Sequence, residues 1–516
     1  MSTIPELFSR AADRYPGRTA VSDSRGRVLS FAQVRSRAQA LAAGLQDIDP
    51  EPVSRVAVIS GNRAELVEID FGIAVAGKVR APLNPKLRPA ERIAFLRNCG
   101  AAILIAEPSE AAFAAELQRA LPGQLRAIVL LGAVGQPGVL DYAELLSADW
   151  PEPAPAGTDA SSPSLIMHTS GTTGKPKGSV LSDGARVAAA THMLLHEFAP
   201  DGDDGMIHAA PMSHGSGSKV LPFFIRGARS VPLERFGAAQ FWHAVRDLGG
   251  TASFLVPTMI RMLLDAPPPE PATAARLRNI TYGGAPSSPQ LLAEAVQRFG
   301  YVFTGVYGSC EALHPVTVLT RADHAELLPP GGPLPAQLPV GIPAMAAGLR
   351  IEGGQAEGEL IVTGPNVMSG YWNDPAATAE VLADGWYRTG DVASADERGF
   401  IYLHGRTKDM IISGGLNVYP AEVEAALERH EDVAECCVIG LPDALWGEAV
   451  TAVIVPADGS APSLAELREH CARYLADYKR PRAVLLVASL PRGPTGKVLK
   501  HEVRDWARRP GPEGTG

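Results

Sequence analysis

Residues 167–179 read MHTSGTTGKPKGS, and this segment begins at the last residue of the apolar run at 165–167. Hydroxyl side chains, glycines and lysines are concentrated in this one segment. Glycines let backbone N–H groups approach an anion, hydroxyls donate hydrogen bonds and lysines neutralise charge, so the composition favours a polyphosphate ligand. The residues that we expect to bind it are Thr169, Ser170, Gly171, Thr172, Thr173, Gly174, Lys175 and Lys177.

This segment differs from the Walker phosphate loop. That motif places four residues between its two glycines and a serine or threonine after its lysine. Here Gly171 and Gly174 are closer together, and Pro176 follows Lys175. A flexible surface turn rich in small polar residues is the alternative interpretation.

The sequence around this segment has the pattern of a layered α/β fold. Short apolar runs at residues 56–60, 101–107 and 127–132 alternate with helical patterns, which is typical of buried strands between helices. Ser30 and Gln33 have the spacing of a capping box. They predict a helix whose buried face carries Val34, Ala38, Leu41 and Leu45.

After about Arg406 the pattern changes to that of a small α+β unit of about 100 residues. We expect one helix with Pro420 in its first turn and a second helix capped by Ser463 and Glu466. Three strands are predicted at residues 433–440, 449–456 and 483–490. The inward residues of the two helices are predicted to be Val423, Ala426, Leu427, Leu464, Leu467, Cys471 and Tyr474.

Composition and charge exclude several classes of protein. A chain of 516 residues with 46% hydrophobic and 20% charged residues has enough apolar side chains for a large core, so disorder is excluded as the main state. A formal net charge of −9 disfavours nucleic-acid binding. The five cysteines form no CxxC pair, which fits a reducing compartment. Without a signal-peptide pattern or a spanning segment, the chain is predicted to be cytoplasmic.

Further segments of the chain occur in the same order as the motifs of a known family. They are PMSHGSG at 211–217, YGGAP at 282–286, YGSCE at 307–311, GELIVTGPNVMSGYW at 358–372, YRTGD at 387–391, GRTKDMIISGGLNVYPAEVE at 405–424 and PRGPTGK at 491–497. Together with residues 167–179, this set resembles the AMP-forming adenylating superfamily. That superfamily comprises acyl-CoA synthetases, the adenylation domains of nonribosomal synthetases and firefly luciferase.

The resemblance implies a fold and a domain organisation. It implies a large amino-terminal α/β domain over residues 1–407, built of stacked sheets flanked by helices plus a small β-barrel. A hinge at Lys408 would connect it to a smaller, mobile α+β domain over residues 408–508, and residues 509–516 would form a disordered tail.

The resemblance also implies an acid:CoA ligase that works in two half-reactions. A carboxylate attacks the α-phosphorus of ATP to give acyl-AMP and pyrophosphate, and the thiol of CoA then takes the acyl group and releases AMP. ATP, Mg²⁺, CoA and a small carboxylic acid are therefore the expected ligands. The alternatives are transfer to the phosphopantetheine of a carrier protein, transfer of preformed acyl-AMP only, and a nucleotide-dependent regulatory protein with a relic ATP loop.

Each role in this chemistry is carried over to a matching residue. Lys497 would bridge the carboxylate and the α-phosphate, Glu311 would bind Mg²⁺ and His214 would line the acid pocket. Tyr307 would lie on adenine, and Asp391 would accept hydrogen bonds from the ribose hydroxyls, with Arg406 close by. The remaining expected contacts of the nucleotide, the acid and the thiol arm are Gly283, Gly284, Ala285, Pro286, Gly308, Ser309, Cys310, Gly414 and Gly415.

Two positions leave alternatives open. The family usually has threonine where this chain has Cys310, so the thiol is either a tolerated isostere or a cause of impaired adenylation. Lys219 could pair with a second carboxylate of the substrate, but an outward-facing side chain is the favoured interpretation. The acid itself is predicted to be bulky and cyclic, aromatic or fatty, because Gly215, Ser216, Gly217, Gly283 and Gly284 leave a roomy pocket.

Overall fold

The computed structural model describes residues 2–132, 138–155, 157–169, 177–353, 357–457, 459–493 and 498–508. The predicted phosphate-binding residues 170–175, the predicted catalytic Lys497 and the predicted tail at 509–516 lie outside these ranges. The chain forms two compact units. The first comprises Met1–Ala336, Val340–Leu349 and Val362–Tyr387, and the second comprises Gln337–Pro339, Arg350–Ile361 and Arg388–Gly516. The hinge at Lys408 and the boundary at 407/408 stay predictions.

A nine-stranded sheet of the first unit positions most of the candidate site. Its order is β16-β15-β14-β13-β12-β10-β11-β1-β2, and the six strands from β14 to β1 are parallel. The bounds are β1 Thr19–Ser22, β2 Val28–Ser30, β10 Gly205–His208, β11 Arg229–Pro232, β12 Ala252–Leu255, β13 Asn279–Gly283, β14 Phe303–Tyr307, β15 Thr317–Leu319 and β16 Ile342–Pro343.

The second sheet of this unit has eight strands in the order β19-β9-β8-β4-β3-β5-β6-β7. The bounds are β3 Arg55–Ile59, β4 Val79–Leu83, β5 Ile103–Ala106, β6 Ala127–Leu130, β7 Leu140–Asp141, β8 Pro163–Thr169, β9 Lys177–Ser182 and β19 Gly370–Tyr371. The strands predicted at residues 56–60, 101–107 and 127–132 are β3, β5 and β6 and are confirmed. Strands β8 and β9 are antiparallel neighbours that flank the undescribed residues 170–176.

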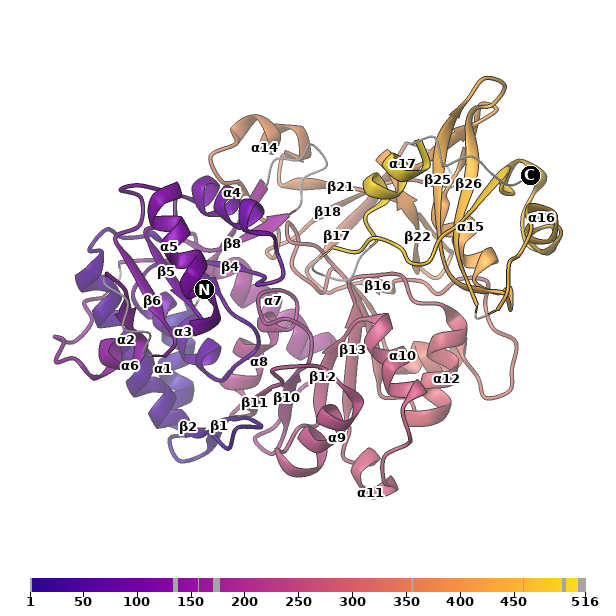
Figure 1. Ribbon diagram of the computed structural model, residues 1–516. Helices are drawn as coiled ribbons and strands as arrows, with labels where there is room; N and C mark the ends of the chain where they lie inside the picture. The colour runs from indigo at the N-terminus through magenta and orange to yellow at the C-terminus, as the bar shows by residue number, and fades with distance from the viewer. Residues whose placement is uncertain are drawn as a thin grey trace. The chain divides into compact units, whose positions relative to one another are not determined.

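The main core lies in a layer of helices between the two sheets (Figure 1). The helix predicted from Ser30 is α2 (Phe31–Ile48), with the capping box and all four predicted core residues buried. The side chains of this layer pack on β1 of one sheet and on β3 and β5 of the other. Its other helices are α1 Ile4–Arg14, α3 Glu65–Val75 and α8 Val220–Ile225.

The remaining helices of the first unit surround the two sheets or connect their strands. They are α4 Pro89–Cys99, α5 Ala111–Ala120, α6 Tyr142–Ser147, α7 Asp183–His196, α9 Ala238–Asp247, α10 Pro257–Asp265, α11 Pro271–Ala274, α12 Pro289–Phe299, α13 Arg321–Leu327 and α14 Pro375–Val381, with 3₁₀ turns η1 Pro108–Glu110 and η2 Gly217–Lys219. Among the helices that the structure describes, none is long and apolar enough to cross a membrane.

A third sheet has strands in both units. It runs β17-β18-β21-β20, with β22 paired to β21, and follows an open path where a small β-barrel was expected. The bounds are β17 Gly348–Glu352, β18 Gly358–Thr363, β20 Leu382–Ala383, β21 Trp386–Ala395 and β22 Ile401–Arg406, followed by the 3₁₀ turn η3 Thr407–Asp409.

The second unit contains the predicted α+β arrangement. Its sheet runs β24-β23-β26-β25, with β27 parallel to β26. The bounds are β23 Ile411–Ser413, β24 Leu416–Val418, β25 Val433–Asp443, β26 Gly447–Pro456, β27 Ala483–Leu486, α15 Pro420–Leu427, α16 Leu464–Cys471, η4 Asp477–Lys479 and α17 Lys500–Arg508. The prediction that Tyr474 faces inward is wrong, because α16 ends at Cys471 and the Tyr474 side chain is exposed.

Candidate active site

The carboxyl ends of β13 and β14 bring two predicted binding segments together. Gly283 lies opposite Val306 in the parallel register, so Gly284 and Tyr307 follow at the same edge of the sheet. A Cβ atom on Gly283 would lie 2.5 Å from the Val306 carbonyl oxygen, and Gly284 has φ of +80°. Both positions therefore require glycine. Ligands of open α/β sheets commonly bind at this edge.

A tight turn after Tyr307 fixes the position of Glu311. The Ser309 hydroxyl accepts hydrogen bonds from the N–H groups of Glu311 and Ala312, each at 3.1 Å. A Cβ atom on Gly308 would lie 2.7 Å from the His314 backbone nitrogen, so this turn leaves no room for a side chain there. Cys310 lies in the same turn and is partly exposed.

Tyr371 connects Glu311 to the strand that follows the predicted phosphate loop. Its hydroxyl donates to Glu311 Oε1 at 3.1 Å, and the Glu311 residue is buried. The Lys177 ammonium lies 5.1 Å from the centroid of the Tyr371 ring. Tyr371 lies within the segment at 358–372, but no sequence signal indicates its role, because β19 pairs with β9 only in the folded chain.

The predicted acid-pocket segment forms a turn after β10. Nδ1 of His214 lies 2.9 Å from the Ser213 hydroxyl. Asn62 holds the start of this turn, since its amide donates to the Ala210 carbonyl at 2.9 Å and its oxygen accepts from the Met212 N–H at 2.8 Å. Asn62 belongs to no motif and was missed in the sequence.

An aromatic wall lies beside this turn. The rings of Phe254 and His314 stack with centroids 5.5 Å apart and an interplanar angle of 27°. A Cβ atom on Gly215 would lie 3.2 Å from the Phe254 ring, so the glycine lets the turn approach it closely. Burial and the nearby charge of Lys219 hold the pKa of His314 well below its usual value, so the imidazole is neutral.

Lys219 is buried, which contradicts the predicted outward-facing side chain. Only 2% of the residue is exposed, and its ammonium forms an ion pair with Glu197 just after α7. The turn η2 leads into α8, whose residues Val220–Phe224 are buried, so Lys219 is carried into the interior with them. Burial lowers the pKa of Lys219 below its usual value, and the Glu197 carboxylate offsets only part of this effect.

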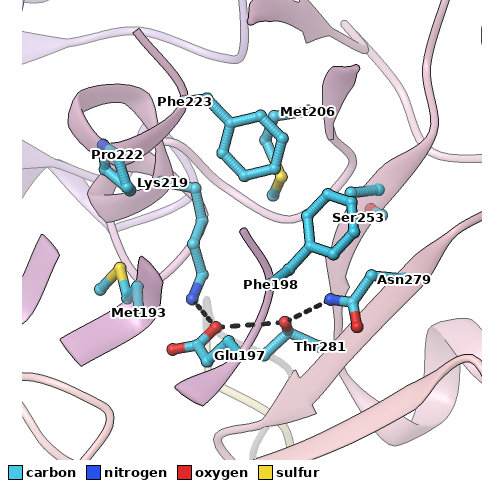
Figure 2. Close-up of a pocket in the computed structure, with 11 residues that line it drawn as sticks. Met193, Glu197, Phe198, Met206, Lys219, Pro222, Phe223, Ser253, Asn279 and Thr281 are labelled. Carbon is cyan, nitrogen blue, oxygen red and sulfur yellow. Dashed lines mark hydrogen bonds and ion pairs between the residues drawn. The ribbon is translucent and has the colours of Figure 1, made fainter. Parts of the chain in front are cut away.

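The ion pair lines a small cavity (Figure 2). The cavity has a volume of about 10 Å³, which is close to the space that one water molecule needs. Apolar side chains from α7, α8 and β10 form one part of its wall, and polar residues of β12 and β13 form the other. The residues that line it are Met193, Glu197, Phe198, Met206, Lys219, Pro222, Phe223, Ala252, Ser253, Asn279 and Thr281.

In the second unit, Asp391 and Arg406 lie side by side on β21 and β22. They are register partners, and Arg406 Nε lies 2.8 Å from Asp391 Oδ1. The Asp391 N–H donates to the Thr389 hydroxyl at 3.0 Å, which helps to fix the carboxylate in place. Their expected contacts with ribose stay predictions.

Gly414 and Gly415 form the two-residue turn between β23 and β24. Both have positive φ, +61° and +79°, as a type I′ hairpin turn requires. The Gly414 N–H donates to the Trp446 carbonyl at 2.8 Å. The tight turn is thus established, whereas a contact of these glycines with a pantetheine arm stays a prediction.

Comparison with known proteins places this arrangement in a family. The sequence profile described as AMP-binding enzyme matches residues 8–372, and that of the AMP-binding enzyme C-terminal domain matches residues 422–497. The chain belongs to the AMP-binding enzyme family. A feruloyl-CoA synthase from Amycolatopsis is 37% identical over 504 residues, which cover 96% of this chain and 97% of the relative.

Two further comparisons extend this result. A fatty acid–[acyl-carrier-protein] ligase from Streptomyces coeruleorubidus is 33% identical over 516 residues, 98% of this chain and 96% of the relative. The solved structure of o-succinylbenzoate CoA synthetase from Bacillus subtilis, in complex with its acyl-adenylate intermediate, superposes with a TM-score of 0.85. It is 28% identical and covers 98% of this chain and 99% of that one.

The predicted superfamily, the α/β fold class and the class of enzyme, an AMP-forming acid:CoA ligase, are confirmed. Within this AMP-binding enzyme, the first unit brings together the segments at 282–286 and 307–311, with Tyr371 added from β19. Asp391, Arg406, Gly414 and Gly415 lie in the second unit.

Proposed function

We propose that this AMP-binding enzyme activates a bulky aromatic or fatty acid as its acyl-AMP, with Mg²⁺ and ATP, and transfers the acyl group to CoA. The observation that carries the proposal is the shared edge of β13 and β14, where Gly284, Tyr307 and Glu311 follow neighbouring strands. The feruloyl and fatty-acid names of the relatives support an apolar acid.

In the first half-reaction, a carboxylate oxygen of the acid attacks the α-phosphorus of ATP, and the bond to the pyrophosphate oxygen breaks. Two anions must approach each other, so cations and donors aimed at the developing charge supply most of the catalysis. Lys497 would provide that charge, together with the donors of residues 169–177. In the second half-reaction, the thiol sulfur attacks the acyl carbon and AMP leaves with one oxygen of the original carboxylate.

The residues around Glu311 fit a magnesium ion. Among the described residues, no group of three histidine, cysteine or acidic side chains could hold a metal by itself. A site with a single carboxylate suits Mg²⁺, which commonly takes one or two carboxylates and completes its shell with substrate phosphates and water. Glu311 would hold the ion, which would neutralise phosphate charge, and the Tyr371 hydroxyl would orient the carboxylate.

Tyr307 and the Asp391–Arg406 pair would bind the nucleoside. A tyrosine ring at the end of β14 can stack on adenine, while the Asp391 carboxylate can accept from two adjacent ribose hydroxyls. Because Arg406 contacts Asp391 Oδ1, it would hold the carboxylate in a fixed orientation.

Transfer to a carrier protein is a second candidate, favoured by the fatty acid–[acyl-carrier-protein] ligase among the relatives. Transfer of preformed acyl-AMP without efficient adenylation is a third, and it rests on Cys310.

Pyrophosphate release with a panel of aromatic and fatty acids, ATP and Mg²⁺ tests the proposal. We expect release with at least one acid, and acyl-CoA when CoA is added. Acyl transfer to a phosphopantetheinylated carrier but not to CoA would favour the second candidate. Consumption of CoA from synthetic acyl-AMP without pyrophosphate release from any acid would favour the third.

A further inference from the structure

A buried ion pair forms a polar floor within the apolar interior of the first unit. The Glu197 carboxylate and the Lys219 ammonium are each only 3% exposed. The Thr281 hydroxyl donates to Glu197 Oε2 at 3.1 Å and accepts from the Asn279 amide at 3.0 Å. Figure 2 shows both interactions of the carboxylate meeting at one oxygen, while the other oxygen points away from Thr281.

This floor is connected to the predicted acid-binding residues along two elements. Lys219 is the last residue of η2, which follows shortly after His214 and Gly215 in the chain. Thr281 precedes Gly283 by two residues on β13, so both positions face the same side of the sheet. A strand rises about 3.3 Å per residue, which places Thr281 about 7 Å below the binding edge at Gly283.

The aromatic wall continues to the same floor. Phe254 is the register partner of Thr281, and its ring lies 5.8 Å from the Lys219 ammonium. The Phe254 ring also stacks on that of His314 and is closely approached by Gly215. Phe254 is therefore near both the predicted acid-binding turn and the ion pair, and an acid that extended along this ring from the binding edge would have its far end at the ion pair.

One atom of the floor lacks a hydrogen-bond donor. Among the residues that the structure describes, none donates to Glu197 Oε1, although this oxygen is fully buried. A buried acceptor without a donor lowers the stability of the fold, and the cost in free energy is larger when the acceptor belongs to a charged group. The cavity beside it, about 10 Å³, has room for one water-sized group and none for a ring.

The charges of the floor restrict which group can fill that space. A second carboxylate on the substrate would face Glu197, and an ammonium group would face Lys219, so each would bury a like charge next to its own kind. A methyl group would leave Oε1 without a donor. A hydroxyl group is neutral, matches the space and donates one hydrogen bond.

We propose that Glu197 Oε1 accepts a hydrogen bond from a hydroxyl group at the far end of the acid, so that the enzyme prefers hydroxylated acids. The inference rests on the proposed function, because it names the acid class that the ligase selects. Lys219 and Thr281 both bind the other carboxylate oxygen, Oε2, so Oε1 is left for the substrate.

Matched acids test this preference on the unmodified enzyme. One series consists of phenylpropenoic acids that carry hydroxyl, hydrogen, methyl or carboxylate at ring position 4. The other consists of straight-chain fatty acids with and without a terminal hydroxyl. In whichever skeleton reacts best, we expect kcat/KM for pyrophosphate release to be at least about 10-fold higher with the hydroxyl than with hydrogen or methyl, and lowest with the carboxylate.

A double variant tests the assigned residues. Glu197→Met with Lys219→Met replaces both charges by apolar groups of similar length, which avoids leaving one charge buried alone. We expect the ratio of kcat/KM between hydroxyl and hydrogen acids to fall toward 1. Glu422→Met with Lys479→Met is the matched control, because it removes an ion pair of the second unit and should preserve the ratio.

The outcomes separate the inference from the proposed function. A ratio near 1 for the unmodified enzyme, with good release from several acids, overturns the inference and leaves the ligase intact. An unchanged ratio in a folded Glu197/Lys219 double variant assigns the preference to other residues and also overturns it. Release from none of the acids overturns the proposed function and the inference together.

Discussion

In the role that we propose for it, Lys497 would supply a charge that only one of the two half-reactions needs. The first transition state joins two anions, whereas attack of a thiol on acyl-AMP does not. We therefore expect Lys497→Ala to lower the rate of acyl-AMP formation by ~10² or more and to spare thioester formation from synthetic acyl-AMP. Pyrophosphate release and CoA consumption measure the two rates separately. Equal loss in both would contradict this division of roles.

Cys310 lies in the turn held by Ser309, between Tyr307, which we propose binds adenine, and Glu311, which we propose binds Mg²⁺. A thiol is close in size to a hydroxyl but bonds more weakly. We expect Cys310→Thr to change pyrophosphate release by less than about 3-fold, as a tolerated isostere would. A rise of about 10-fold or more would show instead that the thiol impairs adenylation.

At the residue scale, the sequence indicated candidate site residues better than it indicated the burial and the partners of their side chains. Glu311 and Tyr307 could be found from the motif YGSCE, because the motif itself carries the spacing. The burial of Lys219 could not, since its partner Glu197 comes from another element and meets it only after α7 and α8 pack together. Tyr371 and Asn62 were missed for the same reason.

The hairpin of β23 and β24 depends on its two glycines to different degrees. Both have positive φ, but a Cβ atom on Gly414 would lie 2.9 Å from the Trp446 ring, whereas one on Gly415 would meet nothing within 4 Å. Gly415→Ala should cost about 1 kcal/mol for the left-handed backbone alone. Gly414→Ala should cost more, because the indole must also move.

Chemical denaturation of the two hairpin variants compares these costs directly. Gly415→Ala is the matched control, since it has the same kind of backbone strain without the contact. Equal free energies of unfolding for the two variants would contradict a role for Trp446 at this turn.

At the element scale, local signals predicted individual helices and strands correctly. The capping box at Ser30 and the proline in the first turn of α15 are both present, because such signals act within a few residues. Cys436 and Cys437 belong to separate clusters on opposite faces of β25, as the alternation of a strand predicts. Tyr474 was misplaced because helix ends depend on contacts that a periodic pattern does not contain.

Histidines whose pKa is lowered by burial, His314 among them, make the first unit sensitive to acid. Burial lowers the pKa of His168 to about 4, of His208 to about 3 and of His324 to about 4. An unfolded histidine titrates near 6.5, so the unfolded chain binds protons that the folded chain excludes. The free energy of unfolding should thus be constant above about pH 7 and fall as the pH drops from about 6.5 toward 4.

Unfolding curves at a series of pH values measure this loss, and the slope gives the number of protons taken up on unfolding. Carboxylates held by arginine add to the slope only below about pH 4.5, as does the partly buried Glu65, whose pKa is lowered to about 2. Stability that stays constant from pH 7 to pH 5 would contradict the neutral, buried state of these histidines.

At the scale of the whole molecule, motif order predicted the family and the class of enzyme. The division of the chain between the two compact units could not be predicted from the sequence in the same way. Gln337–Pro339 and Arg350–Ile361 belong to the second unit although they precede the predicted boundary at 407/408. Strands such as β18 and β21 pair across long stretches of sequence, and no local signal records that pairing.

The path of one oxygen atom tests the two-step account most directly. The acid is prepared with ¹⁸O in its carboxylate and incubated with the enzyme, ATP, Mg²⁺ and CoA. Mass spectrometry then measures the masses of the products. Attack of the carboxylate on the α-phosphorus predicts one ¹⁸O atom in AMP and none in pyrophosphate. AMP without the label, or ADP and labelled inorganic phosphate, would contradict an acyl-AMP intermediate.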